Sequence, residues 1–394
     1  MNNRLTTFAQ GHTTLSEPAA AGEELGKVVN DALGGEPPDV AIVFASSIYA
    51  YAYEDLLKSI DATCHPRIMV GCSSAGEFAG RRSGTQSASI LAIRSSEMQF
   101  RAVVGHGLMT NPKQAAQDCV TGLAGMQGVD YPYRTALVLT DALAGYVDEL
   151  IDYINIESGG SYQLFGGGAG DDAKFSATHV FHGTRALHDT VAMLEILSRR
   201  PVGIGAAHGW EAKGDRLRVT HAERNRVYSL NALPLNEVFA EYAAETGQKF
   251  DPTDPLPFFL NNVVGIEESD GYKLRVPLNL HDDGSVSFAA EIHQGALARL
   301  MGATTGSTCD AASIAAQAAK NSLNGSDIGC ALVFDCAATR LRLGQKFDDE
   351  LNAIEMTLGT DNYVGCNTYG QIVRVHGQFS GFHNCTAVVC IFPD

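Results

Sequence analysis

The hydrophobic and polar positions near the start of the chain predict buried strands that alternate with a helix and a glycine turn. The run DVAIVFAS at 39–46 is apolar, rich in β-branched residues and bounded by proline and serine, as is typical of a buried strand. Apolar residues then recur at helical spacing through SIYAYAYEDLLKSI at 47–60. A second strand enters a glycine turn in RIMVGCSSAGEF at 67–78, and two more strands follow, SASILAI at 87–93 and FRAVVGHG at 100–107.

The same order of elements recurs further along the chain. The opening strands of the copies are IVFAS, LVLTD and LVFDC, at 42–46, 137–141 and 332–336. The returning strands are SASILAI, VAMLEI and TAVVCIF, and a glycine turn lies before each of them, centred on Gly76, Gly170 and Gly370. The sequence therefore predicts an internal duplication, in which one strand–helix–strand–hairpin unit is present about three times.

These repeated units predict an α/β (α+β) fold of mixed, largely antiparallel sheets that pack together with helices outside. The segment TGQKFDPTDPLPFF at 246–259 is rich in proline and aspartate, as is typical of a linker between domains. It predicts an N-terminal domain at 1–248 that holds two units. It also predicts a C-terminal domain at 249–394 that holds lead-in strands and the third unit.

Composition and charge restrict the class of protein. Lys and Arg number 28 and Asp and Glu number 45, which gives a formal net charge of −17. Nucleic acids and anionic membranes are recognised by basic surfaces, so neither is an expected partner. The N-terminus lacks the pattern of a signal peptide and no apolar run is long enough to span a membrane, so we expect a soluble, cytoplasmic protein. The nine cysteines form no CxxC pair, which favours reduced thiols in the core over a zinc ribbon.

The glycine turns have two interpretations. Small residues allow a strand to bend sharply and to pack closely on its neighbour. Alternatively, exposed backbone N–H groups and one polar side chain face a ligand. Aligning the three turns on their central glycine brings Glu77, Asp171 and Gln371 to the next position. No turn opens a helix, which excludes the GxGxxG nucleotide motif, and a Walker A motif is absent.

Two histidines occupy matching places in the first two copies. His106 and His208 each precede a glycine at the end of an apolar strand, and the only tryptophan, Trp210, follows the second of them. A histidine in this position could ligate haem iron or bind a small ligand, or it could be a hydrogen-bonded core residue. His383 and Asn384 begin the last strand, where they could tie the glycine turn to its neighbour.

Five motifs in order resemble the FIST family: VGCSSAGEF, FGGGAGDD, the stretch that begins AAHGWEAKGD, VGCNTYGQI and FHNCTAVVCIF. The resemblance spans about 40–394. It implies an N-terminal and a C-terminal FIST domain in a stand-alone sensory protein that binds a small ligand and regulates a partner in trans. The implied partners are a histidine kinase, a diguanylate cyclase or phosphodiesterase, or a chemotaxis receptor. One bacterial branch, the NosP proteins, binds haem to sense nitric oxide, so haem is a possible cofactor and a haem sensor is the alternative function.

The resemblance also implies which positions bind the ligand. The positions that match the family are Gly71, Cys72, Gly76, Glu77, Gly167, Gly170, Asp171, Trp210, Gly365, Gly370, His383 and Asn384, and Gln371 is added as the residue that aligns with Glu77 in the third turn. The candidates for haem iron are His208, which also matches the family, and His106, which occupies the matching place in the first copy. The chain departs from the family pattern at Gln371, where an acid is expected.

Two other classes of function remain open from the sequence. A hydrolase could use Cys72 as nucleophile or the acids Glu77 and Asp171, and a scaffold would bind no ligand. The position of Cys72 holds cysteine in the third copy and glycine in the second, which is more typical of close packing than of catalysis. Because no set of nucleophile, base and orienting group stands out, we predict that the protein is not an enzyme.

Overall fold

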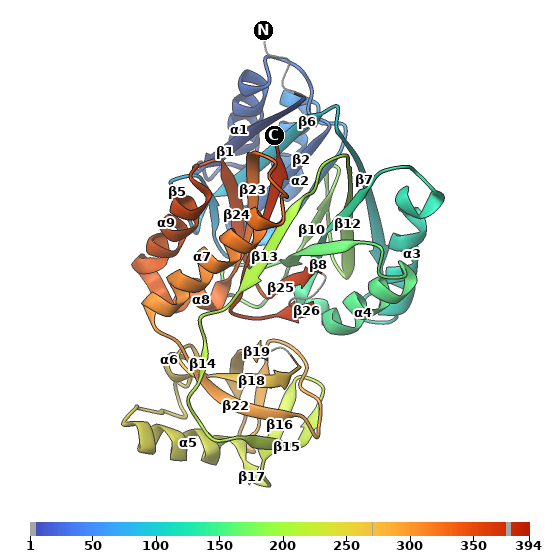
Figure 1. Ribbon diagram of the computed structural model, residues 1–394. Coiled ribbons are helices and arrows are strands. Elements are labelled where there is room, and N and C mark those ends of the chain that lie inside the picture. Colours follow the sequence, from blue (N-terminus) through green and yellow to red (C-terminus); the bar gives the residue numbers. More distant parts are fainter. Residues whose placement is uncertain (1–4, 270, 376–379) are drawn as a thin grey trace.

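The computed structural model describes residues 5–269, 271–375 and 380–394 (Figure 1). It consists of a large body and a small domain, which lies below the body in the view of Figure 1 and is joined to it by two crossing segments. The small domain runs from β14 (Glu211–Ala212) to β22 (Leu297–Gly302), so the chain leaves the body once and returns to it.

The first unit of the body is complete near the N-terminus. It comprises β1 (Thr6–Thr13), α1 (Pro18–Ala32), β2 (Val40–Ser46), α2 (Tyr53–Cys64), β3 (Met69–Ser74), β4 (Glu77–Ala79), β5 (Arg82–Gly84) and β6 (Ala88–Ser95). Strands β2 and β3 pair in parallel, and β6 lies antiparallel between β1 and β2. The helices cover the outer face of the sheet (Figure 1).

The second and third units repeat this order. The second comprises β7 (Met98–His106), α3 (Pro112–Gly122), β8 (Tyr133–Thr140), α4 (Val147–Glu157), β9 (Gln163–Gly168), β10 (Val180–His182), β11 (Arg185–Leu187) and β12 (Thr190–Ser198). The third comprises β13 (Gly203–Ala207), α7 (Thr305–Asn321), β23 (Ile328–Cys336), α8 (Ala337–Leu343), α9 (Phe347–Leu358), β24 (Tyr363–Thr368), β25 (Gln371–Arg374), β26 (Ser380–His383) and β27 (Ala387–Pro393). The small domain is inserted between β13 and α7. The predicted fold class and the three-fold repeat are thus confirmed.

Each unit gives its hairpin to another unit's sheet. Hairpin β4–β5 pairs with β24, β10–β11 pairs with β3, and β25–β26 pairs with β9. The exchange closes a ring, because every six-stranded sheet of the body contains strands from two units. The sheets share one apolar core, in which the ring of Phe334 lies 5.5 Å from that of Phe44 and 6.1 Å from that of Phe165.

Three glycines fix the closest approach between parallel strands. Gly71, Gly166 and Gly365 lie opposite equivalent valines of β2, β8 and β23. A Cβ atom on any of them would lie 1.9–2.1 Å from the carbonyl oxygen of that valine. Backbone packing therefore accounts for these glycines.

The same strand register corrects the alignment of the turns. Glu77 and Gln371 do correspond, since they pair opposite Cys366 and Gly167 at the start of their hairpins. In the second unit the equivalent residue at the start of the hairpin is Val180, which pairs opposite Cys72. Asp171 lies instead in a longer turn that only the second unit has.

The small domain has its own sheet and core. It comprises β14, β15 (Leu217–Glu223), β16 (Arg226–Leu230), β17 (Leu233–Pro234), α5 (Leu235–Thr246), α6 (Leu256–Phe259), β18 (Val263–Glu268), β19 (Gly271–Arg275), β20 (Pro277–Leu280), β21 (Val286–Phe288) and β22. Its centre is a cluster of phenylalanines around Phe239. The segment 246–259, which the sequence predicts as a domain boundary, runs from the last residue of α5 to the end of α6 inside this domain.

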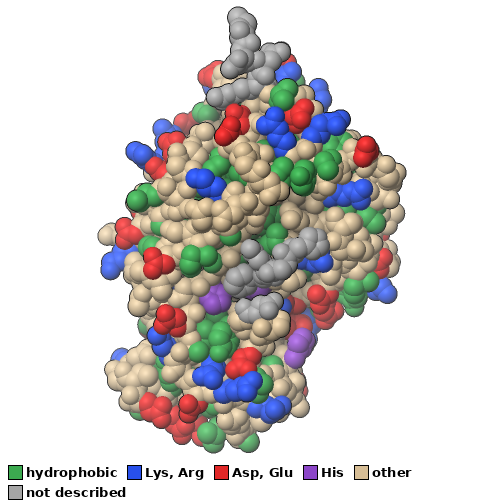
Figure 2. All heavy atoms as spheres, viewed as in Figure 1, with side chains coloured by type: hydrophobic (Ala, Val, Ile, Leu, Met, Phe, Trp, Pro, Cys, Tyr) green, Lys and Arg blue, Asp and Glu red, His purple; other side chains and the backbone are tan. Residues whose placement is uncertain are grey.

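The surface carries charges of both signs. Figure 2 shows blue and red side chains scattered over both parts of the molecule, with no extended basic area on this face. Within the described residues, none of the helices has the length and apolar character needed to cross a bilayer.

Candidate ligand-binding site

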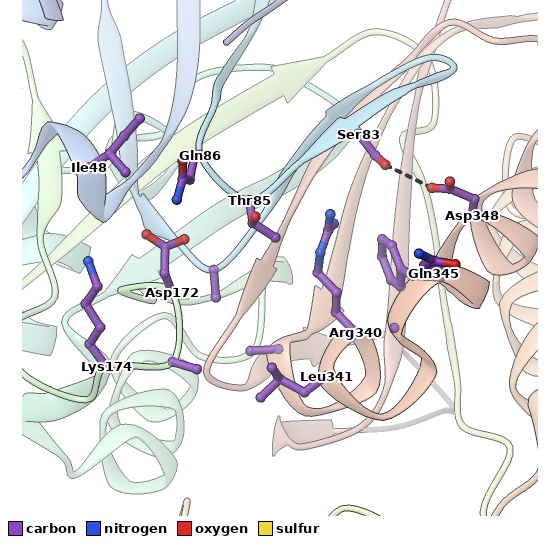
Figure 3. A pocket seen from close by; sticks show the side chains of 15 residues that line it. Ile48, Ser83, Thr85, Gln86, Asp172, Lys174, Arg340, Leu341, Gln345 and Asp348 are labelled. Atoms are coloured by element: carbon purple, nitrogen blue, oxygen red, sulfur yellow. Dashed lines mark hydrogen bonds between the residues drawn. The ribbon is translucent and has the colours of Figure 1, made fainter. Parts of the chain in front are cut away.

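One cavity of the body lies where the carboxyl ends of β2 and β3 face α8. It has a volume of about 700 Å³ and receives residues from all three units (Figure 3). Ile48 follows β2, Asp172 and Lys174 come from the long turn of the second unit, and Arg340 projects from α8. A cavity of this size, at the joint between the units, suits a small molecule.

Two cationic side chains line this cavity. The guanidinium of Arg340 donates from Nη1 to Asn367 Oδ1 at 3.0 Å and lies 4.8 Å from the ring centre of Phe347. Burial lowers the pKa of Arg340, although nearby carboxyl groups oppose this shift. The ammonium of Lys174 donates to Ser47 Oγ at 2.7 Å. Arg340 and Lys174 thus donate to neutral groups, an amide oxygen and a hydroxyl, and each keeps further N–H groups that can donate to an anionic ligand.

The turn that carries Lys174 is held by the carboxylate before it. The carboxylate of Asp171 accepts hydrogen bonds from the Tyr369 hydroxyl and from the backbone N–H groups of Phe175, Ser176 and Ala177. Burial by itself would raise the pKa of Asp171, but these donors outweigh it and lower the pKa. Asp171 therefore has a structural role: it fixes the turn against the third unit.

The turn is also strained. Asp172, Ala173 and Phe175 have φ values of 57°, 62° and 52°, in the left-handed region that favours glycine. Each costs about 1–3 kcal/mol, so the conformation persists only because other contacts impose it. One such contact is Asp172 Oδ2, which accepts from the backbone N–H of Ser47 at 2.8 Å. Strain that is fixed by polar contacts beside a cavity is typical of a binding site.

A buried acid lies behind Arg340. The side chain of Glu77 is fully buried, and its two oxygens accept from Ser74 Oγ at 2.5 Å and Ser87 Oγ at 2.6 Å. Burial raises the pKa of Glu77 to about 8. The carboxyl group is therefore mostly protonated at neutral pH and compensates little of the charge of Arg340, although Asp348, Asp335 and Asp172 also act on that charge.

The equivalent amide makes matching contacts in the third unit. Gln371 donates from Nε2 to Thr368 Oγ1 at 2.9 Å and accepts at Oε1 from the backbone N–H of Thr386 at 3.3 Å. An amide thus fills the place of the acid and uses the equivalent partners. Although the chain departs from the family pattern at Gln371, the amide keeps hydrogen bonds at both positions where the acid makes them in the first unit.

The glycines and the cysteine predicted to bind a ligand lie behind the cavity wall. Gly76 lies closest, since a Cβ atom there would be 2.9 Å from Arg340 Nη1. Cβ atoms on Gly167, Gly170 and Gly370 would meet the side chain of Thr368, the backbone of Ala75 and the ring of Phe382, respectively. Cys72 is fully buried in the shared core. These residues shape the joint, and the cavity itself is lined by others.

The cavity residues themselves were not identified from the sequence. Asp172 stands in the quoted motif FGGGAGDD, but the motif gives no sign that its second aspartate turns toward a cavity. Arg340 follows a buried strand, and a charged residue just after a strand is a weak signal for a site. Neither the cavity nor the partners of these residues could be found without the hairpin exchange.

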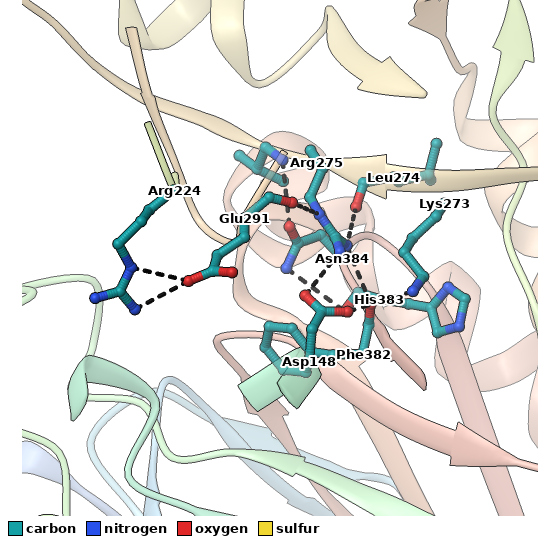
Figure 4. A network of polar contacts seen from close by, with 10 residues as sticks. Asp148, Arg224, Lys273, Leu274, Arg275, Glu291, Phe382, His383 and Asn384 are labelled. Carbon is teal, nitrogen blue, oxygen red and sulfur yellow. Dashed lines mark hydrogen bonds and ion pairs between the residues drawn. The ribbon is translucent and has the colours of Figure 1, made fainter. Parts of the chain in front are cut away.

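Three further predicted residues lie where the body meets the small domain, and two of them, His383 and Asn384, are seen in Figure 4. Asn384 Oδ1 accepts from the backbone N–H of Val276 at 3.3 Å, next to His383. Beside them Asp148 of α4 pairs with Arg275 of β19 at 2.8 Å, and Arg275 donates to the carbonyl of Phe382 at 3.0 Å. Trp210 packs in the same region, below the guanidinium of Arg342. These contacts fix the small domain to the body.

The two candidate haem ligands, His208 and His106, lie apart from each other, and each ring is hydrogen-bonded to the protein. His208 lies between the Tyr272 carbonyl, 3.2 Å from Nε2, and the Trp210 N–H, 3.3 Å from Nδ1. His106 is exposed on β7, in a different sheet, with Nδ1 at 3.0 Å from Thr190 Oγ1. Among the described residues, no group of three or more His, Cys, Asp or Glu side chains is placed to hold a metal ion.

Comparison with known families shows to which family this chain belongs. The FIST N domain matches residues 39–233 and the FIST C domain matches residues 236–374. The chain belongs to the FIST family. FIST domains are associated with sensory signalling and the binding of small ligands. The junction between the two FIST matches falls within the small domain, between β17 and α5, so each half contributes to it.

The similar proteins are distant. Two uncharacterized proteins of Mycobacterium tuberculosis, from strains CDC 1551 / Oshkosh and ATCC 25618 / H37Rv, are each 21% identical over 396 residues. The alignments cover 98% of this FIST protein and 99% of each relative. A crystal structure of cyanuric acid hydrolase from A. caulinodans matches with a TM-score of 0.34 and 8% identity, over 98% of this chain and 99% of that one. A likeness at this level supports no inference about activity.

Proposed function

We propose that this FIST protein is a sensor that binds a small ligand with an anionic group in the 700 Å³ cavity and regulates a signalling partner in trans. The observation that carries the proposal is the pair of cations, Arg340 and Lys174, on opposite walls of the cavity (Figure 3). They belong to different units, so a ligand that contacts both would bridge the third unit and the turn of the second. Such a ligand shifts the protein toward the bridged state by its difference in affinity for the two states.

Binding fits the site better than catalysis. Cys72 is enclosed in the core, where no substrate reaches it. The carboxyl oxygens of Glu77 are occupied by two serine hydroxyls, and Asp171 is occupied by the turn that it holds. Both acids are buried and neither lines the cavity, so a ligand bound there would not contact them.

A panel of amino acids, other small carboxylates and phosphate monoesters tests the proposal by thermal unfolding. A compound at about 100 times its Kd stabilises the folded state by about 2.7 kcal/mol, which raises the Tm measurably. We expect at least one compound of the panel to do so. The substitution Arg340→Gln, which removes the charge, should weaken that compound about tenfold or more because a charge-assisted hydrogen bond is lost.

The matched control is Arg81→Gln. Arg81 pairs with Glu355 at 2.8 Å on the surface and does not line the cavity, so this variant should bind like the wild type. The proposal fails if no compound of the panel raises the Tm, or if Arg340→Gln and Arg81→Gln bind equally well.

The haem alternative makes an opposite prediction for the absorption spectrum. Iron coordination by His208 would have to displace the Tyr272 carbonyl or the Trp210 N–H from the ring. We therefore expect added haem to give no sharp Soret band and no shift with nitric oxide after reduction. A band that is lost in His208→Ala or His106→Ala would instead support the haem sensor.

A further inference from the structure

A second cavity lies in the cleft between the body and the small domain. It has a volume of about 300 Å³. The body contributes the segment 142–148, Phe175, Tyr369 and Phe382, and the small domain contributes residues that include Arg224 and Glu291. The cavity is separate from the first one: Asp172–Lys174 face the first cavity, whereas Phe175 faces the second.

Strained residues converge on this cleft. Tyr146, Phe175 and Arg224 have φ values of 58°, 52° and 56°, and they come from three segments that are far apart in the sequence. Large side chains rarely adopt this left-handed conformation, and it is kept where the surrounding contacts impose it. Here the strain positions three large side chains in the wall of one cavity.

Two flat surfaces result. Phe175 stacks on Tyr369, with ring centres 4.6 Å apart and planes 13° apart, yet 46% of Phe175 remains exposed. On the other side, the guanidinium of Arg224 lies 3.6 Å from the centre of the Tyr146 ring. Each surface presents a face on which a planar ring can stack.

The charges in the wall are largely compensated. Arg224 donates from Nε and Nη2 to Glu291 Oε1, at 3.0 and 2.9 Å (Figure 4). Asp148 pairs with Arg275 at 2.8 Å and with Lys273 at 3.3 Å. An ionic ligand would gain little from side chains that already have partners, so the cleft favours an uncharged molecule.

We propose that this cleft is a binding site for a flat, uncharged aromatic molecule, which stacks on Phe175 and on the Arg224–Tyr146 pair. Such a molecule would contact the body and the small domain at the same time. The inference rests on the stacking surfaces and their charge compensation, and it stands whether or not the first cavity binds an anion.

Two probes of the same carbon skeleton test the site: 2-naphthol, which is aromatic, and decahydro-2-naphthol, which is saturated. Titration calorimetry on the full chain should show 2-naphthol to bind about fivefold or more tightly than the saturated alcohol, because only the planar ring can stack. In Phe175→Ala the affinity for 2-naphthol should fall by about the same factor, whereas Phe175→Tyr should retain it.

The variants also separate the two cavities. Phe175 is half-exposed and strained, so Phe175→Gly, which relieves the strain, keeps the fold testable if Phe175→Ala is unstable. Arg340→Gln should leave 2-naphthol binding unchanged. Equal affinity for both alcohols, unaltered binding in Phe175→Ala and Phe175→Gly, or loss of binding in Arg340→Gln would each overturn the proposal.

Discussion

Replacing Gly71 by alanine should destabilise the body so strongly that little folded protein remains. The added Cβ atom would lie 1.9 Å from the carbonyl oxygen of Val43, well inside van der Waals contact. The obstacle is the backbone of β2, which cannot rotate away as a side chain can. Overpacking of a core costs about 1–3 kcal/mol and occasionally more, and here two paired strands would have to separate. We therefore expect a loss above about 3 kcal/mol in the free energy of unfolding.

The matched control is Gly128→Ala. Gly128 has a φ of 83° and no atom within 4 Å of an added Cβ, so alanine there meets only backbone strain. That strain costs about 1–2 kcal/mol. Urea denaturation of both variants measures the difference. If Gly71→Ala proved no more destabilising than Gly128→Ala, the close approach of β3 to β2 would be wrong.

Replacing Glu77 by glutamine should flatten the pH dependence of stability. The pKa of Glu77 is about 8 in the folded protein and 4.5 when unperturbed, so the folded state holds a proton that the unfolded state releases between these values. The contribution of Glu77 to the free energy of unfolding is therefore fully present below about pH 4.5 and is lost as the pH rises to about 8. The slope is about 1.4 kcal/mol per pH unit, or roughly 3–5 kcal/mol in all. The glutamine variant should lack this loss and be the more stable protein at pH 8.

The reverse substitution, from amide to acid, can be made at the equivalent position of the third unit. Gln371 occupies the equivalent place, so Gln371→Glu should introduce a second loss of the same sign. Denaturant unfolding from pH 5 to pH 8.5 gives the difference between each variant and the wild type, in which the other titrating groups cancel. If the free energy of unfolding depended on pH in the same way in the wild type and in Glu77→Gln, the pKa of Glu77 would not be raised in the folded protein.

The repeat could be predicted because it depends on local pattern. Buried strands such as 332–336 are continuous apolar runs, and the glycine turns stand at matching distances after them. The exchange of hairpins depends on pairing between units, as between β4 and β24, and local pattern carries no sign of which strand becomes the neighbour. Aligning the three turns on their central glycine also placed Asp171 wrongly, because only the strand register shows that the second turn is longer.

The candidate site follows from the same exchange. Arg340 and Asn367 are hydrogen-bonded through Nη1 and Oδ1 at 3.0 Å, although they stand on different elements, and Gly76 of the first unit's turn packs on both. The glycines can be found in the sequence because they recur in each unit, and they recur because each unit packs a strand or turn closely against its neighbour at the same position. The cavity residues differ from unit to unit and therefore form no repeated pattern.

The most direct test of the sensor is hydrogen–deuterium exchange of the full chain with and without the panel compound that raises the Tm most. If the compound bridges Arg340 and Lys174, exchange should slow in the turn 171–177 and in α8, the segments on the two sides of the cavity. Slower exchange in the small domain alone, or no change in either segment, would contradict a ligand site at the joint of the units.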